Sequence, residues 1–200
     1  FKPDEINKIL SVATNQDKNL VATLFMTGLR IGECLGLSWD CVDFENRTLT
    51  VKKQIVNGQI KNILKTSKSK RIIPIIEALI PFLENQKKLT GEKNSFLFLK
   101  KKTNKHYHSA GKIREQIWIR TLNKANVEYR NLHQTRGTFI STLISNGEDI
   151  NYVSKIAGHE NVNITLEKYS KYIPVQNMNF GSCFKKIETS IDTELTPKKN

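Results

Sequence analysis

Apolar residues recur every three or four positions over the first stretch of the chain, which is the spacing of one helical face. Pro3 and the two acids that follow it suit a first helical turn. A second apolar run ends at Gly28, a residue type that commonly closes helices in a left-handed conformation. The pattern therefore predicts two helices before Arg30 and a short helical stretch from Ile31 to Leu37 after it.

Alternation of apolar and polar residues replaces helical spacing after residue 41. Val42–Phe44 and Leu49–Val51 alternate on either side of Asn46-Arg47, as in a short hairpin. Asn57-Gly58 is a strong turn signal, and Arg71–Pro74 has the composition of a further strand. The sequence predicts a small three-stranded antiparallel sheet near the N-terminal third of the chain.

Helical spacing returns after residue 75, and the periodicity becomes weak after residue 176. We therefore expect one domain over residues 1–176 and a tail or docking arm over residues 177–200. The predicted fold class is α+β and mainly α-helical, a helical core with one small sheet. The later helices are expected over Ile76–Lys88, Ser109–Ala125, Leu132–Ser145 and Asp149–Ala157.

Charge gives the first indication of function. The chain has 32 Lys and Arg against 19 Asp and Glu, a net charge of +13. Such an excess favours a polyanionic partner, because each phosphate that a cation neutralises releases condensed counterions. Acidic lipid is the alternative partner, and nucleic acid is the one that we favour.

The cysteines Cys34, Cys41 and Cys183 are odd in number and lack CxxC spacing. This argues against a disulfide framework and a zinc site, and it fits a reducing cytoplasm. Apolar runs fall short of the roughly 20 residues that span a membrane, so we expect no membrane association. Because the chain begins with Phe1 rather than Met, we expect it to be part of a longer protein.

Arg30 lies between two glycines, and Glu33 follows three positions later. An arginine in this setting is suited to hold a phosphate oxygen while the acid orients the guanidinium. A helix break followed by a surface Arg–Glu pair is the alternative interpretation.

The run from Lys61 to Arg71 contains five basic residues and no acid. On the inferred hairpin it could follow a DNA backbone, and one lysine could donate a proton to a leaving oxygen. Backbone contact without chemistry is the interpretation that we accept for most of the run, namely Lys61, Lys68, Lys70 and Arg71.

A third cluster joins His133, Arg136, His159 and Tyr169, which comes ten residues after His159. On a helix, His133 and Arg136 share one face. Two imidazoles, an arginine and a phenol around one phosphate would supply cations, a base and a nucleophile for phosphoryl transfer without a metal. Each histidine alone would more often be structural, so it is the joint spacing that favours this chemistry.

Four stretches together resemble the tyrosine recombinases, or phage-type integrases: TGLRIGECLGLSWDCVDF, KTSKSKRIIPI, HQTRGTFISTLI and AGHENVNITLEKYSKYI. They occur in the order and spacing of that family from Phe1 to about Ile173. The resemblance is to the catalytic domain.

The resemblance implies roles for the cationic residues. Arg30 and Arg136 resemble the two arginines that clamp the scissile phosphate. His159, preceded here by Ala157-Gly158, resembles the histidine that binds a non-bridging oxygen. Glu33 falls where the family often has a supporting acid.

The resemblance also implies the residues that move protons and attack the phosphate. Tyr169 resembles the nucleophile that forms a 3′-phosphotyrosyl link, and we assign its rival Tyr172 to packing. His133 resembles the histidine that accepts a proton. Lys65 resembles the hairpin lysine that protonates the 5′ oxygen, with Lys68 as the alternative.

The implied partner is double-stranded DNA with paired recombination sites, and the implied cofactors are none. Neither ATP nor a metal ion is expected, because the bond energy is kept in the protein–DNA ester. Relatives act as homotetramers on DNA and pass the segment after the nucleophile to a neighbour, for which Val175–Asn200 is the candidate; the isolated domain could be monomeric.

The implied function is a site-specific recombinase or integrase of a mobile element, associated with DNA in a bacterium or phage. A type IB topoisomerase-like enzyme and a basic DNA-binding module without catalysis remain alternatives. One departure from the family pattern is Gly137, where relatives commonly have a histidine after the second arginine.

Overall fold

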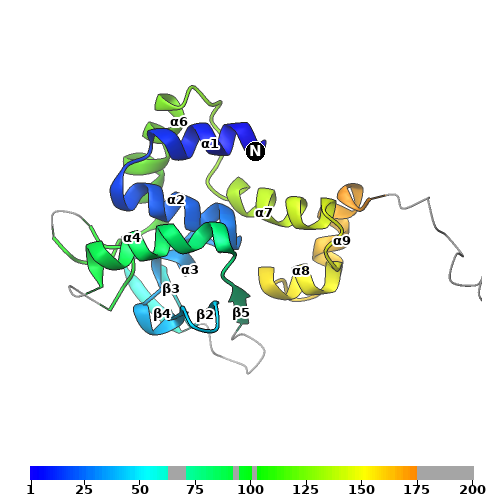
Figure 1. Ribbon diagram of the computed structural model, residues 1–200, viewed down its shortest axis with the longest axis horizontal. Coiled ribbons are helices and arrows are strands. Elements are labelled where there is room, and N and C mark those ends of the chain that lie inside the picture. The colour runs from blue at the N-terminus through cyan, green and yellow to red at the C-terminus, as the bar shows by residue number, and fades with distance from the viewer. Residues whose placement is uncertain (63–70, 92–94, 101–102, 175–200) are drawn as a thin grey trace, which may run out of the picture.

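The first part of the chain, up to about residue 132, folds around one apolar core. The computed structural model describes residues 1–62, 71–91, 95–100 and 103–174. Helix α4 packs against α2, and α1 packs against α6, with the strands at one end of this stack (Figure 1). The helices of this part are α1 (Pro3–Val12), α2 (Asn15–Thr27), α3 (Ile31–Leu35), α4 (Ile80–Thr90), α5 (Ala110–Ile113) and α6 (Ile119–Lys124).

The three-stranded antiparallel sheet that the sequence predicts is present. It consists of β1 (Val42–Asp43), β2 (Thr48–Val51) and β5 (Arg71–Pro74), with β2 in the centre. Leu49 is paired with Val42 on one side and with Ile73 on the other. Leu49 and Ile73 are both buried, so the predicted alternation places one face of the sheet on the core.

A second sheet of two strands was not predicted as a separate unit. It contains β3 (Lys53–Val56) and β4 (Gln59–Asn62), which pair with each other across the predicted turn at Asn57-Gly58. Both turn residues have positive φ, 49° and 78°, as a tight hairpin turn of this type requires.

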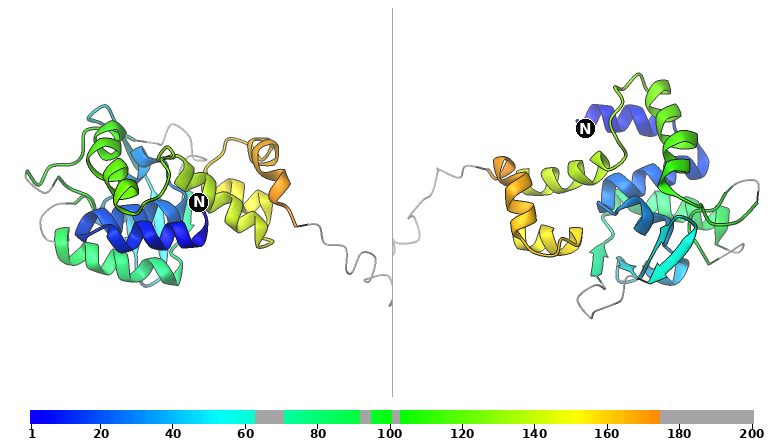
Figure 2. Two further views of the ribbon diagram at one scale, coloured as in Figure 1. Left: turned by 90° about the horizontal axis from the view of Figure 1, so that it is seen from above. Right: turned by 180° about the vertical axis from the view of Figure 1, so that it is seen from behind.

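The last described helices form a second, smaller core. These are α7 (Gln134–Ser145), α8 (Ile150–Ala157) and α9 (Asn163–Tyr169), which lie together to one side of the first core in all three views (Figures 1 and 2). Phe139, Ile140 and Val153 are among its buried residues, and Tyr169 packs against it. The chain therefore has two apolar centres within one α+β fold.

The two cores meet along a seam at which α2 packs against α7 and β5 packs against α8. Gly28 closes α2 with a φ of 63°, and its carbonyl oxygen accepts a hydrogen bond from Arg136. A Cβ atom at Gly28 would lie only 2.4 Å from the ring of Phe139 on α7. The glycine is thus needed both for the backbone conformation and for the close approach of the two helices.

The predicted helices are present with differences in detail, and α9 was not among the predicted helices. The expected Ile76–Lys88 helix begins as a 3-10 turn, Glu77–Leu79, and becomes α-helical only at Ile80. The expected Ser109–Ala125 helix is divided by a π-helical segment, Arg114–Trp118, between α5 and α6. The expected Asp149–Ala157 helix has Asp149 as its N-cap and a left-handed Gly158 as its C-cap. Within the described ranges, the helices fall short of the length and apolar character needed to cross a membrane.

Candidate active site

Glu33 is the acidic centre of a group of arginines at the seam between the two cores. Its side chain is buried and accepts hydrogen bonds from Arg71 Nη1 at 3.1 Å, Arg71 Nη2 at 2.6 Å and Arg30 Nη1 at 3.0 Å. Burial raises the pKa of Glu33, but the hydrogen bonds and charges of Arg71 and Arg30 outweigh it and hold the pKa below the ordinary value. Glu33 is therefore a carboxylate.

Arg30 stands at the surface side of this group. It is the N-cap residue of α3, and its backbone nitrogen donates to Glu33 Oε2 at 2.9 Å. Its side chain is 45% exposed, and Nη2 donates to the carbonyl oxygen of Gly158 at 3.2 Å. The predicted Arg30–Glu33 pair thus exists, and it orients an arginine whose outer edge is open to solvent.

Arg136 is the deeply buried member, with 2% of its surface exposed. Its Nη1 donates to the carbonyl oxygens of Gly28 at 2.8 Å and Ala157 at 2.6 Å. Nη2 is buried and has no hydrogen-bond partner in the part of the chain that the structure describes. Burial, followed by the charge of Arg30, lowers the pKa of Arg136 to about 10, so it is still a cation at neutral pH.

His159 follows the left-handed Gly158 at the end of α8. Its Nδ1 lies 2.6 Å from the hydroxyl of Thr165, a buried residue of α9. Burial, and then the charges of Arg136 and Arg30, lower the pKa of His159 to about 4. The ring is therefore neutral at pH 7 and keeps one N–H for donation.

His133 is the residue directly before α7, one helical turn from Arg136. It lies at the surface of the molecule. Burial of part of the ring and the charges of Arg136 and Arg30 lower the pKa of His133, which favours the neutral form at pH 7. A neutral imidazole has a free lone pair that can accept a proton.

Tyr169 ends α9 and points toward the start of α7. Its hydroxyl would lie 3.6 Å from a Cβ atom at Gly137, the residue next to Arg136. Burial raises the pKa of the phenol, while the charge of Arg136 acts in the opposite direction. Tyr172 is 40% exposed, and its ring centroid is 6.4 Å from that of Tyr169.

Gly137 lies beside the phenol of Tyr169. This is the position at which the resemblance leads one to expect a histidine, and a Cβ atom here would be in ordinary van der Waals contact with the Tyr169 hydroxyl. The departure from the family pattern thus coincides with the contact between α7 and the predicted nucleophile.

The basic run predicted to face DNA is only partly visible. Lys61 is exposed on β4, whereas Lys65, Lys68 and Lys70 lie outside the described residues. Arg71 is not at the surface: it is 8% exposed and bound to Glu33. The burial of Arg71 could not be predicted from the sequence. Arg71 ends a run of basic residues whose composition is typical of a solvent-exposed segment, and its partner Glu33 lies 38 positions earlier.

Thr165 was not identified from the sequence. Nothing in the local pattern marks one threonine of α9, and its role depends on the turn that brings His159 back to it. In the described part of the chain, no group of three His, Cys, Asp or Glu side chains is placed to hold a metal ion.

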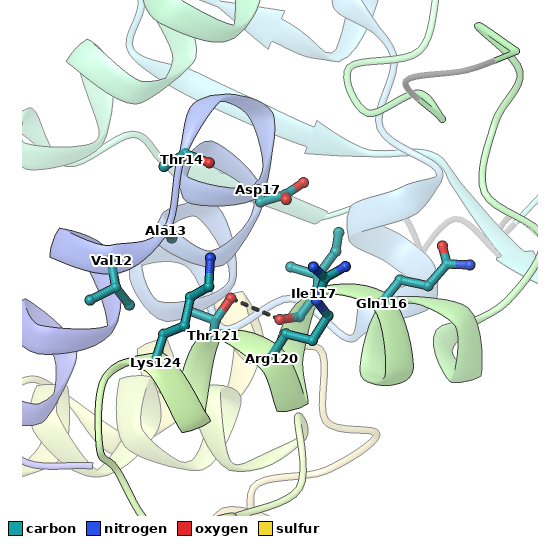
Figure 3. Close-up of a pocket in the computed structure, with 9 residues that line it drawn as sticks. All are labelled: Val12, Ala13, Thr14, Asp17, Gln116, Ile117, Arg120, Thr121 and Lys124. Atoms are coloured by element: carbon teal, nitrogen blue, oxygen red, sulfur yellow. Dashed lines mark hydrogen bonds between the residues drawn. The ribbon is translucent and has the colours of Figure 1, made fainter.

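A pocket of about 220 Å³ lies away from this cluster, between the α1–α2 junction and the π-helical segment with α6 (Figure 3). Arg120 and Lys124 line it together with Asp17 and Thr14. None of the five described residues predicted to be catalytic contributes to the pocket, and Lys65 lies outside the described residues.

Comparison with known proteins gives consistent matches. Residues 1–173 match the profile of the phage integrase family. A "Tyrosine recombinase XerC-like" protein of Caldanaerobacter subterraneus subsp. tengcongensis is 32% identical over 203 residues, which cover 90% of this chain and 52% of that protein. This chain spans about half the length of the curated relatives that it matches.

Two solved structures are similar in fold. The Tn1549 transposon integrase in complex with transposon right end DNA is 26% identical, with a TM-score of 0.75 over 84% of this chain and 60% of that one. The catalytic domain of bacteriophage HP1 integrase is 20% identical, and the match covers 96% of both chains with a TM-score of 0.63. The match to the HP1 integrase domain shows that this chain has the same fold.

Proposed function

The chain belongs to the phage integrase family, and from that premise we propose that it cleaves and rejoins DNA through a covalent bond between Tyr169 and a backbone phosphate. The observation that carries the proposal is the unpaired Nη2 of Arg136, a buried cationic donor, with the Tyr169 hydroxyl beside the next residue of the same helix. A buried donor without a partner is costly, so its persistence points to a ligand that the free protein lacks.

The charges around this donor indicate an anion. Arg30, Arg71 and Arg136 surround a single carboxylate, Glu33, which leaves an excess of positive charge at the seam. A phosphodiester would supply the missing negative charge, and arginine is well suited to bind its oxygens. Arg136 Nη2 and the exposed edge of Arg30 are the donors available to it.

In the proposed reaction, the Tyr169 oxygen attacks the phosphorus and the bond to the 5′ oxygen breaks. The phenolic proton passes to neutral His133, and Lys65 protonates the departing 5′ oxygen. Arg30, Arg136 and the remaining N–H of His159 stabilise the charge on the non-bridging oxygens. A 5′ hydroxyl of another strand then reverses these steps, so one phosphate ester replaces another and no ATP is consumed.

We propose paired recombination sites at the ends of a mobile element as the substrate, bound by a homotetramer. Support comes from the net charge of +13 and from the similarity to an integrase whose structure contains transposon right end DNA. The similarity to a XerC-like recombinase does not indicate which kind of mobile element carries the sites.

Covalent trapping tests the proposal. The probe is a nicked suicide duplex made from the DNA that flanks the gene of this chain, from which the cleaved strand end diffuses away. We expect a protein–DNA adduct that resists denaturing gel electrophoresis, and we expect Tyr169→Phe to abolish it while binding the same duplex. Tyr172→Phe, which removes the neighbouring exposed hydroxyl, should still form the adduct.

If Tyr169→Phe still forms the adduct and Tyr172→Phe does not, the nucleophile is Tyr172. DNA binding without an adduct from either variant or from the unaltered chain would instead support a binding module without catalysis.

A further inference from the structure

The carbonyl oxygens at the end of α8 are bound by three different arginines. Arg71 Nε donates to Ile156 at 2.9 Å, Arg136 Nη1 to Ala157 at 2.6 Å and Arg30 Nη2 to Gly158 at 3.2 Å. The last carbonyls of a helix lack partners within the helix and carry the negative end of its dipole, so cations are favoured there. His159 is the next residue, and its backbone is therefore held by these contacts.

Arg71 is the only one of the three that no catalytic role explains. It makes no contact that the reaction requires, yet it uses three nitrogens on two partners, Glu33 and Ile156. Its partner Glu33 is the same carboxylate that orients Arg30. Arg71 thus links Glu33, which orients the predicted phosphate ligand Arg30, to the end of α8, which precedes the predicted phosphate ligand His159.

Gly158 lies directly on the guanidinium of Arg71. A Cβ atom there would be 2.7 to 2.9 Å from Nη1, Cζ and Nε, and the residue has a φ of 75°. The Gly158 turn and the Arg71 side chain therefore occupy mutually dependent positions, and neither can shift without the other.

Arg71 also fixes this arrangement to the first core. It is the first residue of β5 and is paired with Val51 of the central strand β2. Because β5 packs against α8, the side chain spans the seam between the two cores.

We propose that Arg71 is a positioning residue for strand cleavage, which sets Arg30 through Glu33 and His159 through the Ile156–Gly158 turn. The inference rests on the proposed function and adds a residue that touches no DNA. It replaces the expected role of Arg71 as a phosphate contact of the basic run.

Arg71→Lys is the sharpest variant, because it keeps the charge but cannot make two parallel bonds to Glu33 and a third to Ile156. With the suicide duplex at saturating protein, we expect adduct formation in a single turnover to slow by about 10- to 100-fold, the effect of a small displacement of a reacting geometry. The dissociation constant for the duplex should change by less than about threefold, since a positioning residue acts on the reacting state rather than on binding.

Arg130→Lys is the matched control. Arg130 is likewise an arginine paired with a carboxylate, but its partner is Glu5 and it makes no hydrogen bond to Glu33 or to the end of α8 in the described part of the chain. We expect it to lower stability while the adduct forms at the unaltered rate. Rates are compared at a temperature at which circular dichroism shows each variant to be folded.

If Arg71→Lys does not fold, Gly158→Ala displaces the guanidinium from the other side. Gly147→Ala is its control, because Gly147 has a φ of 85° and no atom within 4 Å of a Cβ position. We expect slow cleavage from Gly158→Ala and an unaltered rate from Gly147→Ala.

An unaltered cleavage rate in folded Arg71→Lys would overturn the inference and leave the proposed function intact. Equal losses in binding and rate would also overturn it, because they would make Arg71 a DNA contact. If the unaltered chain forms no adduct although Tyr169→Phe and the unaltered chain bind DNA equally, the proposed function fails and the role of Arg71 in cleavage fails with it.

Discussion

At the scale of single residues, the tautomer of the neutral His159 ring depends on one neighbour in particular. The Thr165 hydroxyl is buried and lies 2.6 Å from His159 Nδ1. If Thr165 donates to Nδ1, the neutral ring carries its proton on Nε2, which is then available to a phosphate oxygen. The same ring in the other tautomer would present a lone pair to that oxygen and repel it.

This dependence predicts the effect of Thr165→Val, which keeps the shape of the side chain and removes the hydroxyl. We expect strand cleavage to slow by about 10-fold, because only the tautomer and ring orientation are lost, with DNA binding little changed. The unfolding free energy should fall by about 1 kcal/mol for the lost hydrogen bond. Single-turnover adduct formation and chemical denaturation measure the two effects.

Thr165→Ser is the control, because it retains the hydroxyl and should cleave at close to the unaltered rate. An equal rate for the valine and serine variants would mean that Thr165 does not set the His159 tautomer.

At the scale of secondary-structure elements, α8 is held at both ends by polar contacts. At its start, Asp149 Oδ1 accepts a hydrogen bond from the backbone nitrogen of Tyr152 at 2.8 Å. At its end, the arginines bind the carbonyls that lack partners within the helix. A helix of 8 residues is too short to be stable alone, so these contacts and its apolar face must fix it.

Asp149→Ala should therefore lower the unfolding free energy by about 1 kcal/mol, the usual cost of losing an N-cap. Asp149→Asn keeps an acceptor at the same place and should lose only a few tenths of that amount. Urea denaturation of both variants measures the difference. A loss of the same size in both would show that the charge, rather than the capping hydrogen bond, stabilises α8.

The elements also show which parts of the fold a sequence can predict. Asp149 and Gly158 mark the bounds of α8 through local chemistry, and the alternation around Leu49 predicts a strand in the same way. The π-helical segment Arg114–Trp118 has no such local signal, because the helical spacing continues through it. Residue periodicity and capping residues predict where a helix or strand lies and where it ends. They do not predict a change of hydrogen-bonding pattern inside a helix, such as the π-helical segment.

At the scale of the whole molecule, the candidate site is a property of the seam between the two cores. Arg30, Glu33 and Arg71 belong to the first core, whereas Arg136 and His159 belong to the second. Motif spacing could predict that Arg30, Arg136 and His159 meet, because a resemblance to a family carries its fold. It could not predict that Arg71 is buried between them, since that burial depends on a long-range pair with Glu33.

The seam also makes stability depend on pH in a window set by the histidines. The pKa of His159 is about 4 in the folded chain against an ordinary value of 6.5, and that of His133 is lowered as well. Between about pH 6.5 and 4 the unfolded chain therefore binds more protons than the folded chain. The contribution of the histidines to stability is fully present above pH 6.5, decreases as the pH falls through this window and levels off below it.

We expect the unfolding free energy to fall by roughly 1 kcal/mol per pH unit in this window, somewhat less than the limit for one fully buried site because solvent screens the ring. His159→Gln should make the dependence clearly shallower, since it removes the titrating group. Glu33 contributes elsewhere: its lowered pKa means that its stabilising effect is lost only below its ordinary value of 4.5. Urea denaturation at several pH values measures the slope, and an identical slope in both proteins would mean that protonation of His159 does not weaken the seam.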